Sequence, residues 1–127
     1  MVIIDTSIII DHFRRPAGVE TVLKRFVKNF PKELVVISMI TIQELYEGKS
    51  TGKAEIVRYL LTVLASFKIL NYSYETAKLA GELIRDSKKP LEFADAAIAA
   101  TAIVNGGKLL TLNRKDFSEI ENLELAD

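Results

Sequence analysis

The chain has 127 residues, of which 49% are hydrophobic and 27% charged, and this is the balance of a globular protein rather than a disordered one. It contains no cysteine, which excludes disulfides, thiolate metal sites and a cysteine nucleophile. Seventeen basic residues balance seventeen acidic ones, so no overall positive charge attracts nucleic acid and any basic patch must be local. The length suits a single domain over residues 1–127.

The N-terminus starts directly with a strand-like segment and lacks both the basic leader and the apolar stretch of a secretory signal. Apolar runs such as Val2–Ile4 are short, and the alanine-rich stretch 94–104 is interrupted by Asp95. No segment is therefore expected to span a membrane, and we expect a cytoplasmic protein.

Short apolar runs along the chain predict the strands of a sheet. Val2–Ile4 has no polar residue and ends at Asp5, a pattern typical of a strand buried on both faces. The other predicted strands are Leu34–Ile37, Lys68–Leu70 and Leu109–Leu112, with Leu123–Leu125 as a weak fifth candidate.

Between these runs, apolar residues recur at helical spacing over residues 19–30, 56–67 and 77–84, the last before Pro90. Helices therefore alternate with continuous apolar strands. Parallel strands need crossover connections that cover both faces of their sheet. We predict a three-layer α/β/α domain with a central parallel sheet of four to five strands.

Two acidic residues near strand ends each have a structural alternative. Asp5 closes the first strand and could start a turn or cap the next helix, a role that also suits Ser7. Glu44 stands in Thr41-x-x-Glu44, which matches a capping box. Both positions nevertheless fall at the carboxyl-end edge of the sheet, where ligands bind in open α/β folds.

Asp95 is the hardest acidic residue to explain by structure alone. The segment from Ala94 to Val104 is otherwise apolar on nearly every side, so its helix is expected to be buried. A buried carboxylate costs on the order of several kcal/mol unless it is paired, hydrogen-bonded or bound to metal. A favourable interaction with the helix dipole, in the first turn after Pro90, is the alternative.

Asp116 lies just beyond the fourth predicted strand, within the segment Thr111-Leu112-Asn113-Arg114-Lys115-Asp116-Phe117. Asn113-x-x-Asp116 is also compatible with a capping pair, and Asp116 with a salt bridge to a nearby cation. Asn113 itself could point into the same pocket, so both residues are kept as candidates.

These acidic residues all follow a strand or lie on the helix beginning beside it, so they are expected to converge on one rim. Clustered carboxylates raise one another's pKa and need a countercharge. Mg²⁺ or Mn²⁺ suits such a site, because these ions prefer oxygen ligands and commonly share them with a substrate phosphate. The pattern predicts metal-assisted phosphodiester hydrolysis, with these catalytic and metal-binding candidates: Asp5, Glu44, Asp95 and Asp116.

Four segments carry the acidic residues: Val2-Ile3-Ile4-Asp5-Thr6-Ser7, Glu44 before Gly48, Asp95-Ala96-Ala97-Ile98-Ala99-Ala100-Thr101-Ala102, and Leu110-Thr111-Leu112-Asn113-Arg114-Lys115-Asp116-Phe117. Together they resemble a PIN-domain ribonuclease of the VapC toxin type. The resemblance covers nearly the whole chain, and the alanine-rich segment is its most specific part. It implies a PIN-like fold and a Mg²⁺- or Mn²⁺-dependent endoribonuclease that uses the same four acidic residues. Members vary at the fourth position, where Asn113 could share or replace the role of Asp116.

The resemblance also implies an RNA substrate, a homodimer and a small antitoxin protein that neutralises the enzyme. The sequence is compatible with protein partners, because Val35 to Ile42 and the helix from Ala54 to Phe67 hold more apolar surface than one sheet face requires.

Three other functions fit parts of the pattern. One is an RNA-processing nuclease of the same fold that is not a toxin. A second is a phosphoacceptor signalling domain, although the third strand ends in Leu70-Asn71-Tyr72 without an aspartate to accept phosphate. The third is a non-catalytic module whose acidic pocket binds a basic partner segment.

Pairs of basic residues flank the acidic motifs and are candidates for holding RNA phosphates, although a solvated surface charge is the favoured explanation for each pair alone. The pairs are Arg14 with Arg15, Lys49 with Lys53, Lys88 with Lys89, and Arg114 with Lys115. His12, the single histidine, is expected on a helix surface or in packing rather than in acid/base catalysis.

Overall fold

Four short parallel strands form the centre of the structure, a computed structural model that describes residues 1–126. The strands are β1 (Val2–Ile4), β2 (Val35–Ser38), β3 (Lys68–Leu70) and β4 (Lys108–Leu110), and their order across the sheet is β3-β2-β1-β4. In the central register, Ile3 lies beside Val36 on one side and Leu109 on the other. All three pairings are parallel, as predicted.

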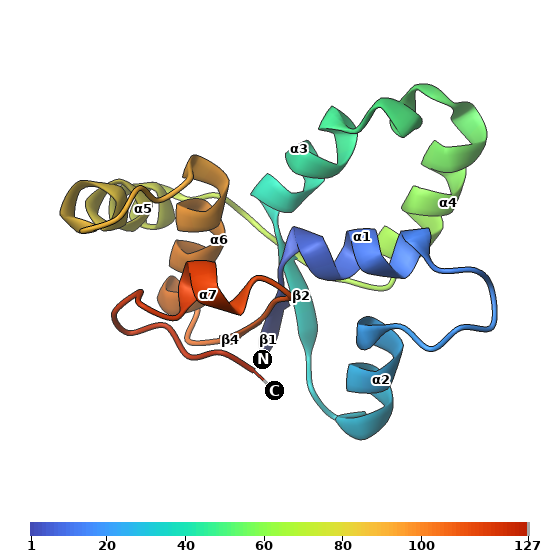
Figure 1. Cartoon of the computed structure of the whole chain (residues 1–127), viewed down its shortest axis with the longest axis horizontal. Coiled ribbons are helices and arrows are strands. Elements are labelled where there is room, and N and C mark those ends of the chain that lie inside the picture. Colours follow the sequence, from blue (N-terminus) through green and yellow to red (C-terminus); the bar gives the residue numbers. More distant parts are fainter. Residues whose placement is uncertain (127) are drawn as a thin grey trace.

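Helices cover both faces of this sheet (Figure 1). They are α1 (Thr6–Arg14), α2 (Val22–Asn29), α3 (Met39–Glu47), a 3₁₀ turn η1 (Lys49–Gly52), α4 (Ala54–Leu64), α5 (Tyr74–Asp86), α6 (Phe93–Val104) and α7 (Arg114–Phe117). None of the helices found in residues 1–126 has both the length and the apolar character needed to cross a bilayer. The predicted three-layer α/β/α fold is confirmed.

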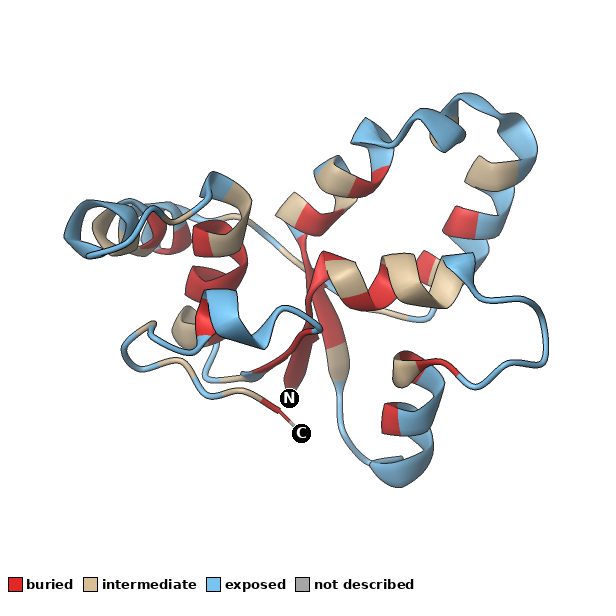
Figure 2. Cartoon of the chain, viewed as in Figure 1, coloured by how far each residue is buried: buried red, intermediate tan, exposed pale blue. Residues whose placement is uncertain are grey.

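Alternate residues of β1 face the two halves of the core. Ile4 packs in a cluster with Ile8 of α1, Phe26 of α2 and Leu60 of α4. Ile3 packs on the opposite face, in a cluster that contains side chains of α6 and α7. Both faces of β1 are therefore buried, as its unbroken apolar sequence predicted (Figure 2).

Helix α6 is the most deeply buried helix of the layer that covers the Ile3 face. Residues 96–102 are all buried, and the alanines among them let α6 lie close to both the sheet and α5. Its first turn, which precedes these buried residues, carries the half-buried Asp95. The helix thus connects the core directly to the edge where the acidic residues were predicted to meet.

Some boundaries differ from the predicted ones. Leu123–Leu125 does not form a strand, and only a single parallel bridge joins Leu125 to Leu109. Strand β4 ends at Leu110, two residues earlier than predicted, because the Thr111 hydroxyl accepts a hydrogen bond from the Asn113 backbone and turns the chain there. Helix α2 begins only at Val22, since the Thr21 side chain caps it by accepting from the Lys24 backbone.

Candidate active site

Asp5 sits where β1 passes into α1 and is held firmly at the sheet edge. Its backbone nitrogen donates to the Leu110 carbonyl at 2.9 Å. Its side chain is 3% exposed, and Oδ2 accepts hydrogen bonds from Ser7 Oγ at 2.8 Å and Thr111 Oγ1 at 2.7 Å. Asp5 occupies the N-cap position of α1 but makes no capping hydrogen bond, so the alternative of a capping role is wrong.

Only one of the two oxygens of the Asp5 carboxylate accepts hydrogen bonds from residues 1–126. Both hydroxyl donors reach Oδ2, and none of the hydrogen bonds within residues 1–126 involves Oδ1. Ser7 and Thr111 are themselves fixed, because Ser7 accepts from the Leu112 backbone at 3.2 Å and Thr111 from the Asn113 backbone at 2.9 Å. The arrangement orients Asp5 and leaves one carboxylate oxygen for a ligand.

Glu44 of α3 is bound from the neighbouring helix. Its Oε1 accepts a hydrogen bond of 2.6 Å from the Thr6 hydroxyl, which also lies 3.0 Å from the Thr41 hydroxyl. The capping-box alternative is wrong, because Ser38 caps α3 by accepting from the Ile40 backbone and Thr41 lies inside the helix.

The environment of Glu44 favours its protonated form. Burial raises the pKa of Glu44, and the charge of Asp5 acts in the same direction. The hydrogen bond from Thr6 opposes these effects and lowers the pKa of Glu44. Glu44 therefore lies within electrostatic range of Asp5, although the two residues come from different strand ends.

Asp95 lies in the first turn of α6 and receives the strongest influence from the other acids. Burial, the largest cause, and then the charges of Asp5, Asp116, Glu44 and Glu92 together raise the pKa of Asp95 to about 6. The charges of acids that follow β1 or lie on α7 and α3 thus act on one carboxylate. All four acidic residues that the sequence suggested thus lie toward the same edge of the sheet, and their role as one site stays a prediction.

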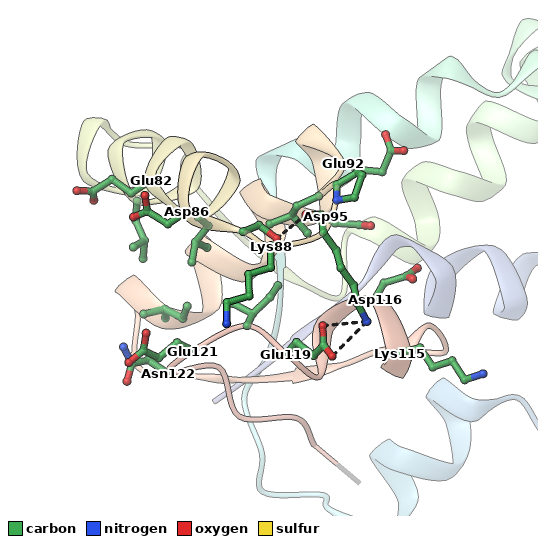
Figure 3. Close-up of a pocket in the computed structure, with 18 residues that line it drawn as sticks. Glu82, Asp86, Lys88, Glu92, Asp95, Lys115, Asp116, Glu119, Glu121 and Asn122 are labelled. Atoms are coloured by element: carbon green, nitrogen blue, oxygen red, sulfur yellow. Dashed lines mark hydrogen bonds and ion pairs between the residues drawn. The ribbon is translucent and has the colours of Figure 1, made fainter.

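Asp116 is exposed on α7, and the burial of Phe117 beside it anchors this short helix to the core. The Asn113 side chain makes no capping hydrogen bond, and the Asp116 backbone instead donates to the Asn113 carbonyl at 3.0 Å. No salt bridge within residues 1–126 involves Asp116. Capping by Asn113 and charge pairing therefore do not explain Asp116, and Figure 3 shows its carboxylate on the same side as that of Asp95.

Three hydroxyl residues of this site were not predicted to have a role at the acids. Thr6, Ser7 and Thr111 each donate a hydrogen bond to an acidic side chain. A signal for them exists in the sequence, because Thr6 and Ser7 directly follow Asp5 and Thr111 follows a strand in the way Asp5 does. Which hydroxyl binds which carboxylate depends on the folded arrangement.

The donors of the acidic cluster suit a hard divalent cation. They are carboxylate and hydroxyl oxygens, and no Lys or Arg forms a salt bridge with any of the four acids within residues 1–126. In the same residues, no group of three or more Asp, Glu, His or Cys side chains is arranged to hold a metal ion by itself. The fit is thus to an ion that takes one or two carboxylates and completes its shell with water and substrate phosphate, as Mg²⁺ commonly does.

This combination of a parallel sheet, flanking helices and an acidic cluster at the carboxyl ends of the strands matches a known class. The family model described as PIN domain matches residues 2–123. The chain therefore belongs to the PIN-domain family, as the sequence motifs suggested.

Its relatives within that family include VapC ribonucleases. It is 31% identical to ribonuclease VapC1 of Methanocaldococcus jannaschii, covering 98% of this chain and 84% of the relative. It is 29% identical to ribonuclease VapC10 of Mycobacterium tuberculosis, covering 98% and 91% of the two chains. A solved toxin-antitoxin complex from Klebsiella pneumoniae contains a chain that is 30% identical, with a TM-score of 0.74 over 97% of this chain and 95% of that one.

Proposed function

We propose that this protein is a metal-dependent endoribonuclease that hydrolyses RNA phosphodiester bonds and acts as the toxin of a toxin-antitoxin pair. The observation that carries the proposal is the placement of four acidic side chains at the carboxyl-end edge of one sheet, where hydroxyl groups hold Asp5 and Glu44 and no salt bridge within residues 1–126 neutralises any of the four. The VapC ribonucleases among its relatives support RNA as the substrate.

Asp5, Glu44 and Asp95 are the residues proposed to hold Mg²⁺ or Mn²⁺, one or two of them as direct ligands and the others through bound water, with Asp116 as a further ligand or as the residue that positions water. When bound, such an ion supplies Lewis-acid polarisation of the phosphodiester and offsets its charge. Ser7 and Thr111 hold Oδ2 of Asp5 and leave Oδ1 without a hydrogen bond from residues 1–126, and Thr6 holds Glu44. These hydrogen bonds preorganise the carboxylates, so that they need not rearrange when substrate binds.

The test is cleavage of a single-stranded RNA by the purified chain, with Mg²⁺ or Mn²⁺ and with EDTA. We expect cleavage only with metal, and its loss in Asp5→Asn and Asp95→Asn variants that remain folded by circular dichroism. Glu20→Gln, which removes an exposed carboxylate from the loop before α2, is the matched control and should keep full activity. Intact RNA with either metal, or undiminished cleavage by both Asn variants, would contradict the proposal.

Protein partners follow from the same proposal. A small antitoxin and a second copy of the chain are the expected partners, and exposed apolar side chains on α3 and α4 support this: Met39, Tyr46, Tyr59 and Leu61. Expression of the chain alone should arrest bacterial growth, and expression of Asp95→Asn should not. Growth that is unaffected by an active nuclease would favour the RNA-processing alternative. Light scattering of the purified chain measures its molar mass and should give that of a homodimer.

A further inference from the structure

A groove of about 1150 Å³ extends from the acidic cluster along the surface of the molecule. It lies between the end of α5, the connection from α5 to α6, and α7 with the residues that follow it (Figure 3). Asp95 and Asp116 are among its lining residues, so the groove opens directly onto the proposed reaction site.

Only some of the basic residues that were predicted from the sequence as RNA contacts line this groove. Lys88, Lys89 and Lys115 line it, whereas neither Arg14 with Arg15 nor Lys49 with Lys53 does. Arg114 is also absent from the lining and donates to the Ala126 carbonyl at 2.8 Å. Three lysines from two separate elements thus border the same channel as two of the acids.

Three of the acidic residues that line the groove are paired with a basic side chain, which reduces their repulsion of a polyanion. Glu82 is paired with Lys78 at 3.3 Å, Asp86 with Arg85 at 2.8 Å, and Glu119 with Lys89 at 3.2 Å. Glu92 and Glu121 form no salt bridge within residues 1–126 and are the remaining unfavourable charges outside the acidic cluster.

Two of the three lysines are available for a ligand. In the part of the chain that is described, neither Lys88 nor Lys115 forms a salt bridge. In the view of Figure 3, the Lys88 side chain and the Lys115 side chain extend to opposite sides of the Asp95 and Asp116 carboxylates. A strand lying across the acids would therefore pass a free ammonium group on each side.

We propose that this groove carries single-stranded RNA on either side of the scissile bond, with Lys88 and Lys115 binding backbone phosphates. The assignment rests on the proposed ribonuclease function and extends it to the path of the substrate. Lys89 acts differently, because its pairing with exposed Glu119 is weak enough for a phosphate to displace the carboxylate. RNA entry then converts Lys89 into a third phosphate contact.

The test measures binding of a fluorescein-labelled single-stranded RNA of about 12 nucleotides, a length within the usual site sizes for such strands. Fluorescence anisotropy is recorded with Mg²⁺ in the Asp5→Asn background, which keeps the RNA intact. We expect Lys88→Gln combined with Lys115→Gln to weaken binding about tenfold. The plot of log affinity against log salt should become shallower by about 1.4, or about 0.7 for each lost contact to a single strand.

Two further variants sharpen the comparison. Lys49→Gln combined with Lys53→Gln removes the same charge from residues outside the groove and should change affinity less than twofold. Glu119→Gln releases Lys89 and should tighten binding about two- to threefold. A weakening that is equal in both lysine pairs would show a general charge effect and would overturn the assignment of the groove.

The outcomes separate this proposal from the function on which it rests. If the wild-type chain cleaves RNA with metal but the Lys88 and Lys115 double variant binds and cleaves as the wild type does, the groove is not the RNA path and the function stands. If the wild-type chain neither binds nor cleaves RNA, both proposals fail. Loss of dimer formation in the double variant, measured by light scattering, would assign the groove to protein association instead.

Discussion

Replacing Asp95 by asparagine should make the protein more stable while it abolishes cleavage. The carboxylate has an ordinary pKa of 3.8, and burial together with neighbouring acids raises the pKa of Asp95 to about 6 in the folded protein. The folded state therefore binds this proton more tightly than the unfolded state does. Protonated Asp95 therefore contributes to the free energy of unfolding, and this contribution is fully present below pH 3.8 and is lost as the pH rises through about 6.

The size of the effect follows from that difference. A rise in the pKa of Asp95 from 3.8 to about 6 corresponds to roughly 3 kcal/mol of differential interaction between the charged and neutral forms. Asp95 is only half-buried, and solvent screening reduces the figure to about 1–2 kcal/mol. Asparagine has nearly the same shape and carries no charge, so it removes the repulsion without opening a cavity.

Urea denaturation in EDTA measures the difference at two pH values. At pH 8, Asp95→Asn should have a free energy of unfolding about 1–2 kcal/mol above that of the wild type, and near pH 4 the two should agree. Glu20→Gln, with an exposed carboxylate, should match the wild type at both pH values. An Asp95→Asn protein that is no more stable than the wild type at pH 8 would refute the repulsion among the acids.

Two other substitutions test the scaffold of the site. Thr111→Val removes the hydroxyl that donates to Asp5, and it should lower kcat about tenfold or more and the free energy of unfolding by about 1 kcal/mol. Thr111→Ser keeps a hydroxyl and should restore kcat. Equal kcat values in the valine and serine variants would show that this hydroxyl does not orient Asp5. Gly107→Ala should cost about 1–3 kcal/mol in thermal or urea unfolding, because its Cβ would clash with Cδ1 of the fully buried Ile3 and lie 3.2 Å from the Met1 carbonyl oxygen. Gly81→Ala on α5, with nothing within 4 Å, should instead stabilise by about 0.5–1 kcal/mol, and a Gly107→Ala protein as stable as the wild type would contradict the packing described.

The layered fold was predictable because its signals are local. A strand such as Val2–Ile4 is apolar on both faces only where helices cover both sides of a sheet, and the alternation of strands with helices requires parallel crossovers. The convergence of the acids followed from the same geometry, since parallel strands end at one edge. The weak segment Leu123–Leu125 failed as a strand because a single bridge to Leu109 does not make a ladder.

The finer structure of the site was beyond local reasoning. The spacing Thr41-x-x-Glu44 suits a capping box, yet the hydroxyl that binds Glu44 comes from Thr6, 38 residues away. Thr111 reaches Asp5 across 106 residues. Such pairings depend on how helices approach one another, and a single sequence carries no direct record of that distance.

The bond between Asp5 and Thr111 joins the first strand of the chain to the last one. During synthesis, residues 1–100 emerge with Asp5, Glu44 and Asp95 already present, but without β4, Thr111 or Asp116. β1 then lacks its β4 neighbour, and Asp5 lacks the donor that fixes its carboxylate. Asp5 is consequently expected to be oriented only after β4 has joined the sheet, so that assembly of the candidate site is tied to the last step in building the sheet.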